Sequence, residues 1–262
     1  MILSPGSNYI GGIAKISSDF IDATGGTVVI SGDFKIHTFT GSGTFTILKG
    51  SGNVEFLLVA GGGGGGGADF AFGGAGGGGG GGFIYQNLIM NVGSYPATIG
   101  AGGVGGIRGG AFGTNGSNSI FLAFTAIGGG KGGNAPDSAS PANSGGSGGG
   151  AGRLGTTGGN GTPGQGNNGG SWAGFVNGAG GGGATGAGQS DTATDGGNGG
   201  TGYLFYGVEY AKGGKGGTQN SPNPIPSPAN LGQGGAAMYG TATANNGADG
   251  SDGILIVRYK FK

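Results

Sequence analysis

Few side chains in this chain of 262 residues are suited to acid–base chemistry. His37 is the single histidine, and it lies in a stretch with the pattern of a β-strand. That position is typical of a histidine on a sheet surface or at the edge of a core. Asp137, Asp191 and Asp195 fall on predicted loops, where a carboxylate pair would suit glycan hydrolysis, but nothing in the sequence fixes their separation. We read them as solvated loop caps and expect no enzymatic activity and no catalytic residues.

Phosphate and metal sites are also poorly supported. Lys131 and Lys215 follow glycine runs, but each is followed by another glycine, whereas a phosphate loop needs Lys-Ser/Thr at the start of a helix. Residues 247–254 are one residue away from a calcium-binding β-helix repeat, yet a single copy cannot form the stacked turns that such sites need. The chain has no cysteine, which excludes thiolate ligands. We expect no cofactor and no metal.

The charge balance excludes several classes of partner. Eleven basic and eleven acidic residues are scattered singly, so no basic face is available for nucleic acid or for an anionic membrane. No apolar run approaches the roughly 20 residues of a membrane span. The first residues lack the charged and apolar regions of a signal peptide. If the protein works outside a cell, we expect it to be released by lysis or as part of a particle.

The glycine content dominates the composition, with 80 glycines in 262 residues. A disordered linker would have few aromatic residues and many charged ones, whereas this chain is 9% aromatic and 8% charged. Ordering a glycine costs about 0.5–1 kcal/mol more than ordering an alanine. That cost is offset where three-residue-per-turn helices without side chains lie close enough to hydrogen-bond one another. The Gly-X-Y period of collagen is absent, because residues 61–67 are all glycine. We therefore predict packed polyglycine-II helices.

Strand patterns flank and interrupt the glycine segments. They predict strands at 27–30, 34–39, 44–48, 53–60, 83–90, 95–99, 119–127 and 254–259, and Gly41-Ser42-Gly43 predicts a hairpin. We expect an all-β fold with non-regular content: a small antiparallel sheet plus a sandwich of polyglycine-II helices with loop tips. The predicted divisions are an N-terminal attachment or flexible segment (1–26), a sheet anchor (27–60), the glycine-rich region (61–253) and a closing strand (254–262) that pairs with residues 54–59.

Four motifs in this order carry a resemblance to a known family. They are residues 35–46 (KIHTFTGSGTFT), 54–61 (VEFLLVAG), 95–103 (YPATIGAGG) and 250–259 (GSDGILIVRY). Together they resemble the glycine-rich domain of bacteriophage tail-fibre and receptor-binding proteins and, more loosely, the distal tail-fibre adhesins of T-even-like phages. The resemblance covers roughly residues 27–259. It implies a virion protein whose loops recognise a host-surface molecule, an outer-membrane protein or a polysaccharide.

The function expected from this resemblance is non-enzymatic binding at the tip of a tail fibre, outside the host cell. The alternative is a structural virion component, such as a fibre shaft, decoration or baseplate-peripheral protein. Attachment to other virion subunits would use the N-terminal region, and the oligomeric state is open between monomer and homotrimer. Ice binding and polysaccharide depolymerisation are further alternatives, and the irregular lengths of the glycine segments argue against the first.

Aromatic residues on short loops are the best candidates for receptor contact, because they give rigid contact area at low entropic cost. Each would equally serve to cap the glycine helices and shield them from water. The candidate receptor-binding residues are Trp172, Phe175, Phe70, Phe72, Tyr203, Phe205, Tyr206, Asn223 and Asp137.

Overall fold

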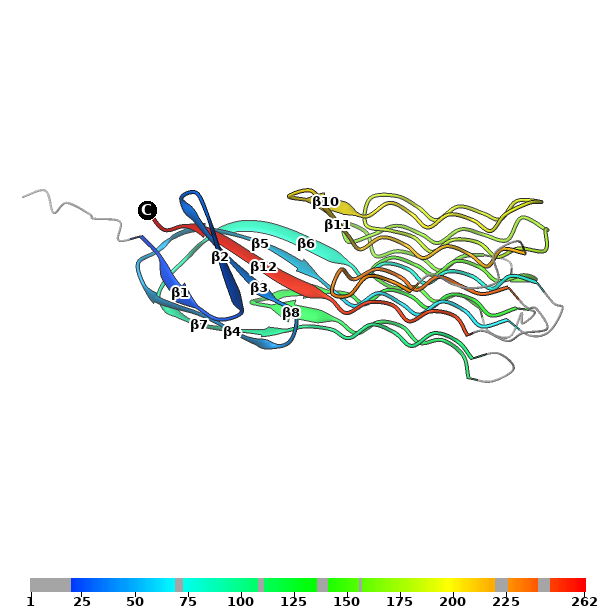
Figure 1. Ribbon diagram of the computed structural model, residues 1–262, viewed down its shortest axis with the longest axis horizontal. Coiled ribbons are helices and arrows are strands. Elements are labelled where there is room, and N and C mark those ends of the chain that lie inside the picture. The colour runs from blue at the N-terminus through cyan, green and yellow to red at the C-terminus, as the bar shows by residue number, and fades with distance from the viewer. Residues whose placement is uncertain are drawn as a thin grey trace, which may run out of the picture.

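The computed structural model describes residues 20–68, 73–107, 111–135, 141–155, 157–219, 226–239 and 246–262. Within these ranges every regular element is a β-strand, and all pairs of named strands are antiparallel. The molecule is elongated, with the strands at one end and the glycine-rich segments at the other (Figure 1). The described residues contain no helix with the length and apolar character needed to cross a membrane. The prediction of an all-β, antiparallel fold is confirmed.

Two five-stranded sheets and one separate hairpin make up the strand region. The first sheet has the order β1-β4-β7-β8-β9, the second has the order β2-β3-β12-β5-β6, and β10 pairs with β11. The strands are β1 (Asp22–Thr24), β2 (Thr27–Ser31), β3 (Phe34–Phe39), β4 (Gly43–Lys49), β5 (Gly52–Val59), β6 (Phe83–Met90), β7 (Gly93–Thr98), β8 (Ser119–Phe121), β9 (Phe124–Ala126), β10 (Tyr203–Phe205), β11 (Val208–Tyr210) and β12 (Ile254–Lys260).

The core lies between the two five-stranded sheets, because side chains alternate along each strand. In β5, Val54, Phe56 and Leu58 face the first sheet, and in β12 Leu255 and Val257 do the same. The opposite faces of these two strands, near the glycine segments, form a second cluster with the β10–β11 hairpin. β12 lies between β3 and β5, with Ile254 opposite Val59, so the last strand of the chain joins the strand that leads into the first glycine segment.

Two strand predictions are wrong. Residues 34–39 and 44–48 do not form a hairpin, because β3 pairs with β2 and β12, whereas β4 pairs with β1 and β7. The chain crosses between the sheets here, which lets Phe39 and Phe45 both enter the shared core. The single strand expected over residues 119–127 is broken at Leu122, which has a φ of 56°. The break is stabilised because Phe121 and Phe124 both pack against Phe56.

The glycine segments form a lattice joined by backbone hydrogen bonds. Every amide from Gly74 to Gly82 donates, in strict rotation, to three neighbouring segments: 127–133, 176–182 and 232–238. Carbonyl groups of the same stretch accept from three others, 60–66, 147–153 and 214–217. A three-residue period with bonds to surrounding segments is the pattern of polyglycine II, in which each helix lacks internal hydrogen bonds.

Glycine is required at these positions because the backbones touch. A Cβ built on Gly78 would overlap the carbonyl of Gly63, and one built on Gly81 would overlap the carbonyl of Ala60. Side chains return where a segment has an outer face. Along residues 101–107 the exposed positions are Ala101, Val104 and Ile107, spaced by three as the helix period requires. Residues between them are buried or half-buried.

The single histidine is fully buried in the core between the sheets. Its Nδ1 donates to the carbonyl of Gly25 over 2.7 Å, and Nε2 lies 3.1 Å from the hydroxyl of Tyr259. A carbonyl only accepts, so the proton is on Nδ1 and the Tyr259 hydroxyl donates to Nε2. Burial lowers the pKa of His37 below its usual value. The ring is therefore a neutral structural group.

Replacing Gly78 by alanine is expected to destabilise the protein, whereas the same change at Gly41 is expected to be nearly neutral. A Cβ at Gly78 would meet backbone atoms, but at Gly41 nothing lies within 4 Å. Overpacking of this kind costs about 1–3 kcal/mol or more. Equilibrium unfolding in denaturant measures both variants. Equal stabilities would contradict the requirement for backbone contact.

The unfolding free energy is expected to fall as the pH drops from 7.5 to 5.5. Because the pKa of His37 is lower in the folded state, the unfolded chain binds a proton first, and stability is lost below the ordinary histidine pKa. The loss is limited to about 1.4 kcal/mol per pH unit. Thermal unfolding of the wild type and of His37→Gln, measured at both pH values, tests this. A wild-type stability that does not change, or a variant with the same dependence, contradicts it.

Candidate recognition surface

The lattice has a free end, defined here as the end away from the sheets and marked by Ala68, Ala135 and Met238. The chain leaves β5 at Val59, runs through 61–67, and returns to β6 at Phe83, so Ala68 lies at the far end of that excursion (Figure 1). Ala68 and Ala135 form a β-bridge, and both pack with Met238 in a small apolar cluster. Where the segments end, packing between these side chains takes the place of the direct backbone contacts between glycines.

Residues 171–177 form a loop at the free end, called here the Trp172 loop. The carbonyl of Val176 accepts a 2.7 Å hydrogen bond from the amide of Gly74, which fixes the loop to the lattice. Trp172 Nε1 donates to the carbonyl of Phe175 over 2.7 Å, closing the loop on itself. Gly174, with a φ of 100°, makes the turn. The Trp172 ring is half-buried, and Phe175 is exposed.

Asp191 supports the Trp172 loop from a neighbouring segment. Its Oδ1 accepts a 2.6 Å hydrogen bond from the amide of Ala173. The residue is buried, and its Oδ2 has no hydrogen-bond partner among the described residues. Burial raises the pKa of the Asp191 carboxyl, although the backbone amides around it act in the opposite direction. A buried carboxylate is thus used to position an aromatic loop.

Asn177 and Asp195 join the loops of the free end to one another. Asn177 donates to the carbonyl of Thr192 and accepts from the amide of Gln219. Asp195 accepts a 2.6 Å bond from the Thr218 hydroxyl and forms an ion pair with Lys215 at 2.9 Å. These contacts hold the pKa of Asp195 below its usual value. Asp191 and Asp195 therefore both have partners that explain them as structural residues.

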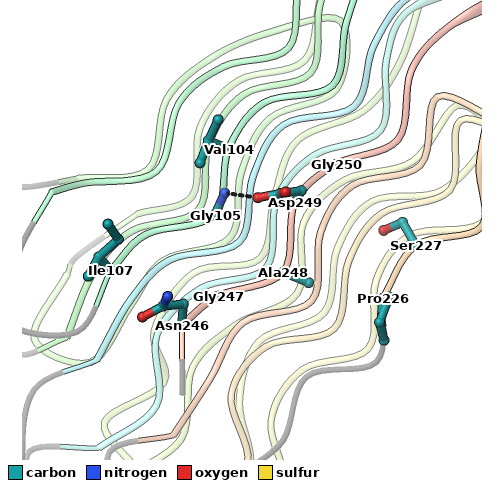
Figure 2. Close-up of a pocket in the computed structure, with 10 residues that line it drawn as sticks. All are labelled: Val104, Gly105, Ile107, Pro226, Ser227, Asn246, Gly247, Ala248, Asp249 and Gly250. Carbon is teal, nitrogen blue, oxygen red and sulfur yellow. Dashed lines mark hydrogen bonds between the residues drawn. The ribbon is translucent and has the colours of Figure 1, made fainter. Parts of the chain in front are cut away.

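A groove of about 480 Å³ lies on one side of the lattice near the free end. Residues 246–250 form its floor, Val104 and Ile107 stand on one side, and Pro226 and Ser227 stand on the other (Figure 2). Asp249 is held in place because its Oδ1 accepts a 2.7 Å hydrogen bond from the amide of Gly105 (Figure 2). The groove combines walls that are largely apolar with a fixed carboxylate.

The groove is not among the features predicted from the sequence. Val104 and Ile107 are three residues apart, as are Asn246 and Asp249, and all four are exposed. In a helix with three residues per turn, such a spacing places side chains on one face. The outer face of a glycine segment can therefore be identified in the sequence from non-glycine residues spaced three apart.

The aromatic residues Tyr203, Phe205 and Tyr206 lie on the β10–β11 hairpin, at the end of the lattice that adjoins the sheets (Figure 1). Tyr203 stacks on Phe83 at the start of β6, with ring centroids 4.6 Å apart, and Phe205 is buried. Tyr206 is exposed, but its hydroxyl donates to Glu55 of β5 over 2.8 Å. The hairpin thus packs on the second sheet, away from the Trp172 loop.

Four candidate residues, Phe70, Phe72, Asp137 and Asn223, lie outside the described residues. Of the two lysines that follow glycine runs, Lys131 donates to the carbonyl of Pro141 over 3.0 Å, and Lys215 pairs with Asp195. In the part of the chain that the structure describes, no three His, Cys, Asp or Glu residues are grouped in a way that would hold a metal ion.

The fold and this surface define an all-β protein with a polyglycine-II lattice. A scan against protein-family models matched residues 38–260 to the family described as "Glycine-rich domain". Since the match spans most of the 262 residues, the chain belongs to this glycine-rich domain family. A search of curated proteins found no match.

Removing the Asp191 carboxylate is expected to loosen the Trp172 loop with little effect elsewhere. In Asp191→Ala the amide of Ala173 loses its acceptor, at a cost of about 1–3 kcal/mol. Trp172 is the only tryptophan, so its fluorescence reports on this loop directly and is expected to shift to longer wavelength. Asp249→Ala is the matched control, because it removes an equivalent bond to Gly105 on the side of the lattice. The same emission spectrum in wild type and Asp191→Ala would contradict this role.

Proposed function

We propose that this protein is a non-enzymatic bacteriophage virion protein that recognises a host-surface molecule through the free end of its lattice. The observation that carries the proposal is the construction of that end. The exposed Phe175 and half-buried Trp172 stand on a loop whose backbone is bonded to the lattice at Gly74 and to the buried Asp191. A rigid aromatic loop suits binding, since little entropy is lost on contact.

The groove near the free end of the lattice is included in the same proposal. Val104, Ile107 and Pro226 give its walls apolar surface, and its floor carries Asp249 and the exposed Asn246. Small-molecule and sugar sites combine apolar surface with a few placed polar groups. The groove therefore offers a second contact area for the proposed receptor, which is an outer-membrane protein or a surface polysaccharide.

Membership of the glycine-rich domain family agrees with this proposal. The four motifs that resemble phage tail-fibre proteins fall at defined places in the fold. Residues 54–61 are the join between β5 and the first glycine segment, and residues 250–259 are the join between the last segment and β12. The resemblance therefore rests on the connections between sheets and lattice, in addition to glycine content. In this proposal the protein is located in the virion, at the end of a tail fibre.

Binding of labelled protein to a panel of bacterial strains tests the proposal. For a strain that is bound, the double variant Trp172→Ala, Phe175→Ala is expected to lose about tenfold or more in affinity, because truncating aromatic anchors often costs over 1 kcal/mol. Leu204→Ala is the control, since Leu204 is 68% exposed but lies on the hairpin at the sheet end. Protease or periodate treatment of the cells separates a protein receptor from a polysaccharide.

Two results would overturn the proposal. The first is no binding to any strain that is infected by a phage carrying this protein. The second is binding that the double variant leaves unchanged. Either result would favour the alternative, a structural virion component such as a fibre shaft, decoration or baseplate-peripheral protein.

A further inference from the structure

β2 is the outer strand of the second sheet, and it is open to solvent on three sides. Among the described residues it pairs only with β3, from Thr27 opposite Thr38 to Ser31 opposite Phe34. All five of its residues are exposed. Val28, Val29 and Ile30 have exposed fractions of 46%, 55% and 60%. Three consecutive β-branched apolar side chains thus lie uncovered on a sheet edge.

This edge lacks the features that normally prevent strands from pairing with other molecules. Edges are usually protected by charges, proline, bulges or short length. β1, at the edge of the first sheet, has three residues, a register shift after Asp22, and an ion pair from Asp22 to Lys35. β2 is longer, keeps an unbroken register with β3, and contains no charged residue. The edges formed by β1 and β2 therefore differ in how they are protected.

Each face of β2 carries at least one exposed apolar side chain. Val29 is on the same face as Ile36, its partner in β3, and Val28 and Ile30 point to the opposite face. Strands with apolar side chains on both faces are ordinarily buried on both faces. The composition of β2 therefore matches the interior of a larger sheet.

We propose that β2 pairs with β2 of a second copy of this chain, antiparallel and around a two-fold axis at Val29. The sequence Thr27-Val28-Val29-Ile30-Ser31 is symmetric in polarity about its centre. Antiparallel self-pairing places Val29 opposite Val29, Val28 opposite Ile30, and Thr27 opposite Ser31. Every cross-strand pair is then matched in polarity and free of charge, as a self-complementary two-fold interface requires. The second sheets of the two copies become one continuous sheet.

This inference concerns the sheet end and does not depend on the proposed function of the free end. Multi-angle light scattering of the full chain, over a range of concentrations, measures the assembly. The mass of the wild type is expected to approach twice 24.5 kDa as concentration rises. In Val29→Lys two like charges would face each other, and the dissociation constant is expected to rise about tenfold or more. Leu204→Lys is the control and is expected to behave as the wild type.

A cysteine at the centre of β2 gives a second, independent measurement. The chain contains no cysteine, so a single introduced thiol reports only on its own position. In Val29→Cys the two thiols would lie on directly opposite residues, with Cβ atoms about 4.5–5.5 Å apart. Mild oxidation is expected to convert most of this variant to a disulfide-linked dimer and to leave Leu204→Cys largely monomeric.

Three results would overturn the proposal. The first is a wild type that remains at the mass of one chain at every concentration. The second is a Val29→Lys variant that associates as strongly as the wild type. The third is equal cross-linking of Val29→Cys and Leu204→Cys, which would show that encounters between the copies are not centred on β2.

Discussion

Direct contact between backbones is the constraint on which the structure depends. Within the lattice, an amide of one segment meets a carbonyl of the next with no side chain between them, as in the bond from Gly79 to Gly130. A Cβ built on Gly79 would overlap the carbonyl of Ser147, a residue of a different neighbour. Gly79 is thus confined by a segment other than the one to which it donates. Net stabilisation per bond is about 1 kcal/mol, so the lattice is stable only because many segments surround each one.

The outer faces of the lattice show how the same constraint is relaxed. Where a segment has no neighbour, a side chain supplies the acceptor that a backbone would have provided. Asn115 and Asn118, three residues apart, accept hydrogen bonds from the amides of Lys131 and Gly128. Asp252 and Asp249 do the same for Gly102 and Gly105. Polar residues in the glycine segments are thus acceptors for edge amides, and this also accounts for the acidic pair that resembles part of a calcium repeat.

The glycine runs and the alternation of β5 and β12 were sufficient to predict the all-β class and the polyglycine-II lattice. The division of the strands between two sheets was not predictable, because Gly41-Ser42-Gly43 has the composition of a hairpin turn. The chain passes from one sheet to the other at this point, and does not form a hairpin, because Phe39 and Phe45 are both buried in the core that the two sheets share. Likewise, Leu122 adopts a positive φ because Phe121 and Phe124 pack on Phe56, a contact between distant residues.

The positions of the candidate residues could be predicted only in part. Trp172 and Phe175 were identified because a loop between glycine runs must lie at an end of the lattice. Which end it occupies depends on the direction of each segment, and this follows from bonds such as Gly74 to Val176. Tyr203 and Phe205 belong to an equally aromatic loop that turns at the opposite end, where Phe83 provides a partner for stacking.

The two ends of the molecule therefore differ in what they leave exposed. At the sheet end the stacked aromatic rings are largely used in packing, and three consecutive exposed apolar side chains lie on the extended edge of β2. At the free end aromatic and apolar side chains stand on short loops and in a groove. An extended edge favours pairing with another strand through backbone bonds, whereas loops and grooves favour contact through side chains. Since the segments between them are fixed by direct backbone hydrogen bonds, the two surfaces are held apart and can act independently.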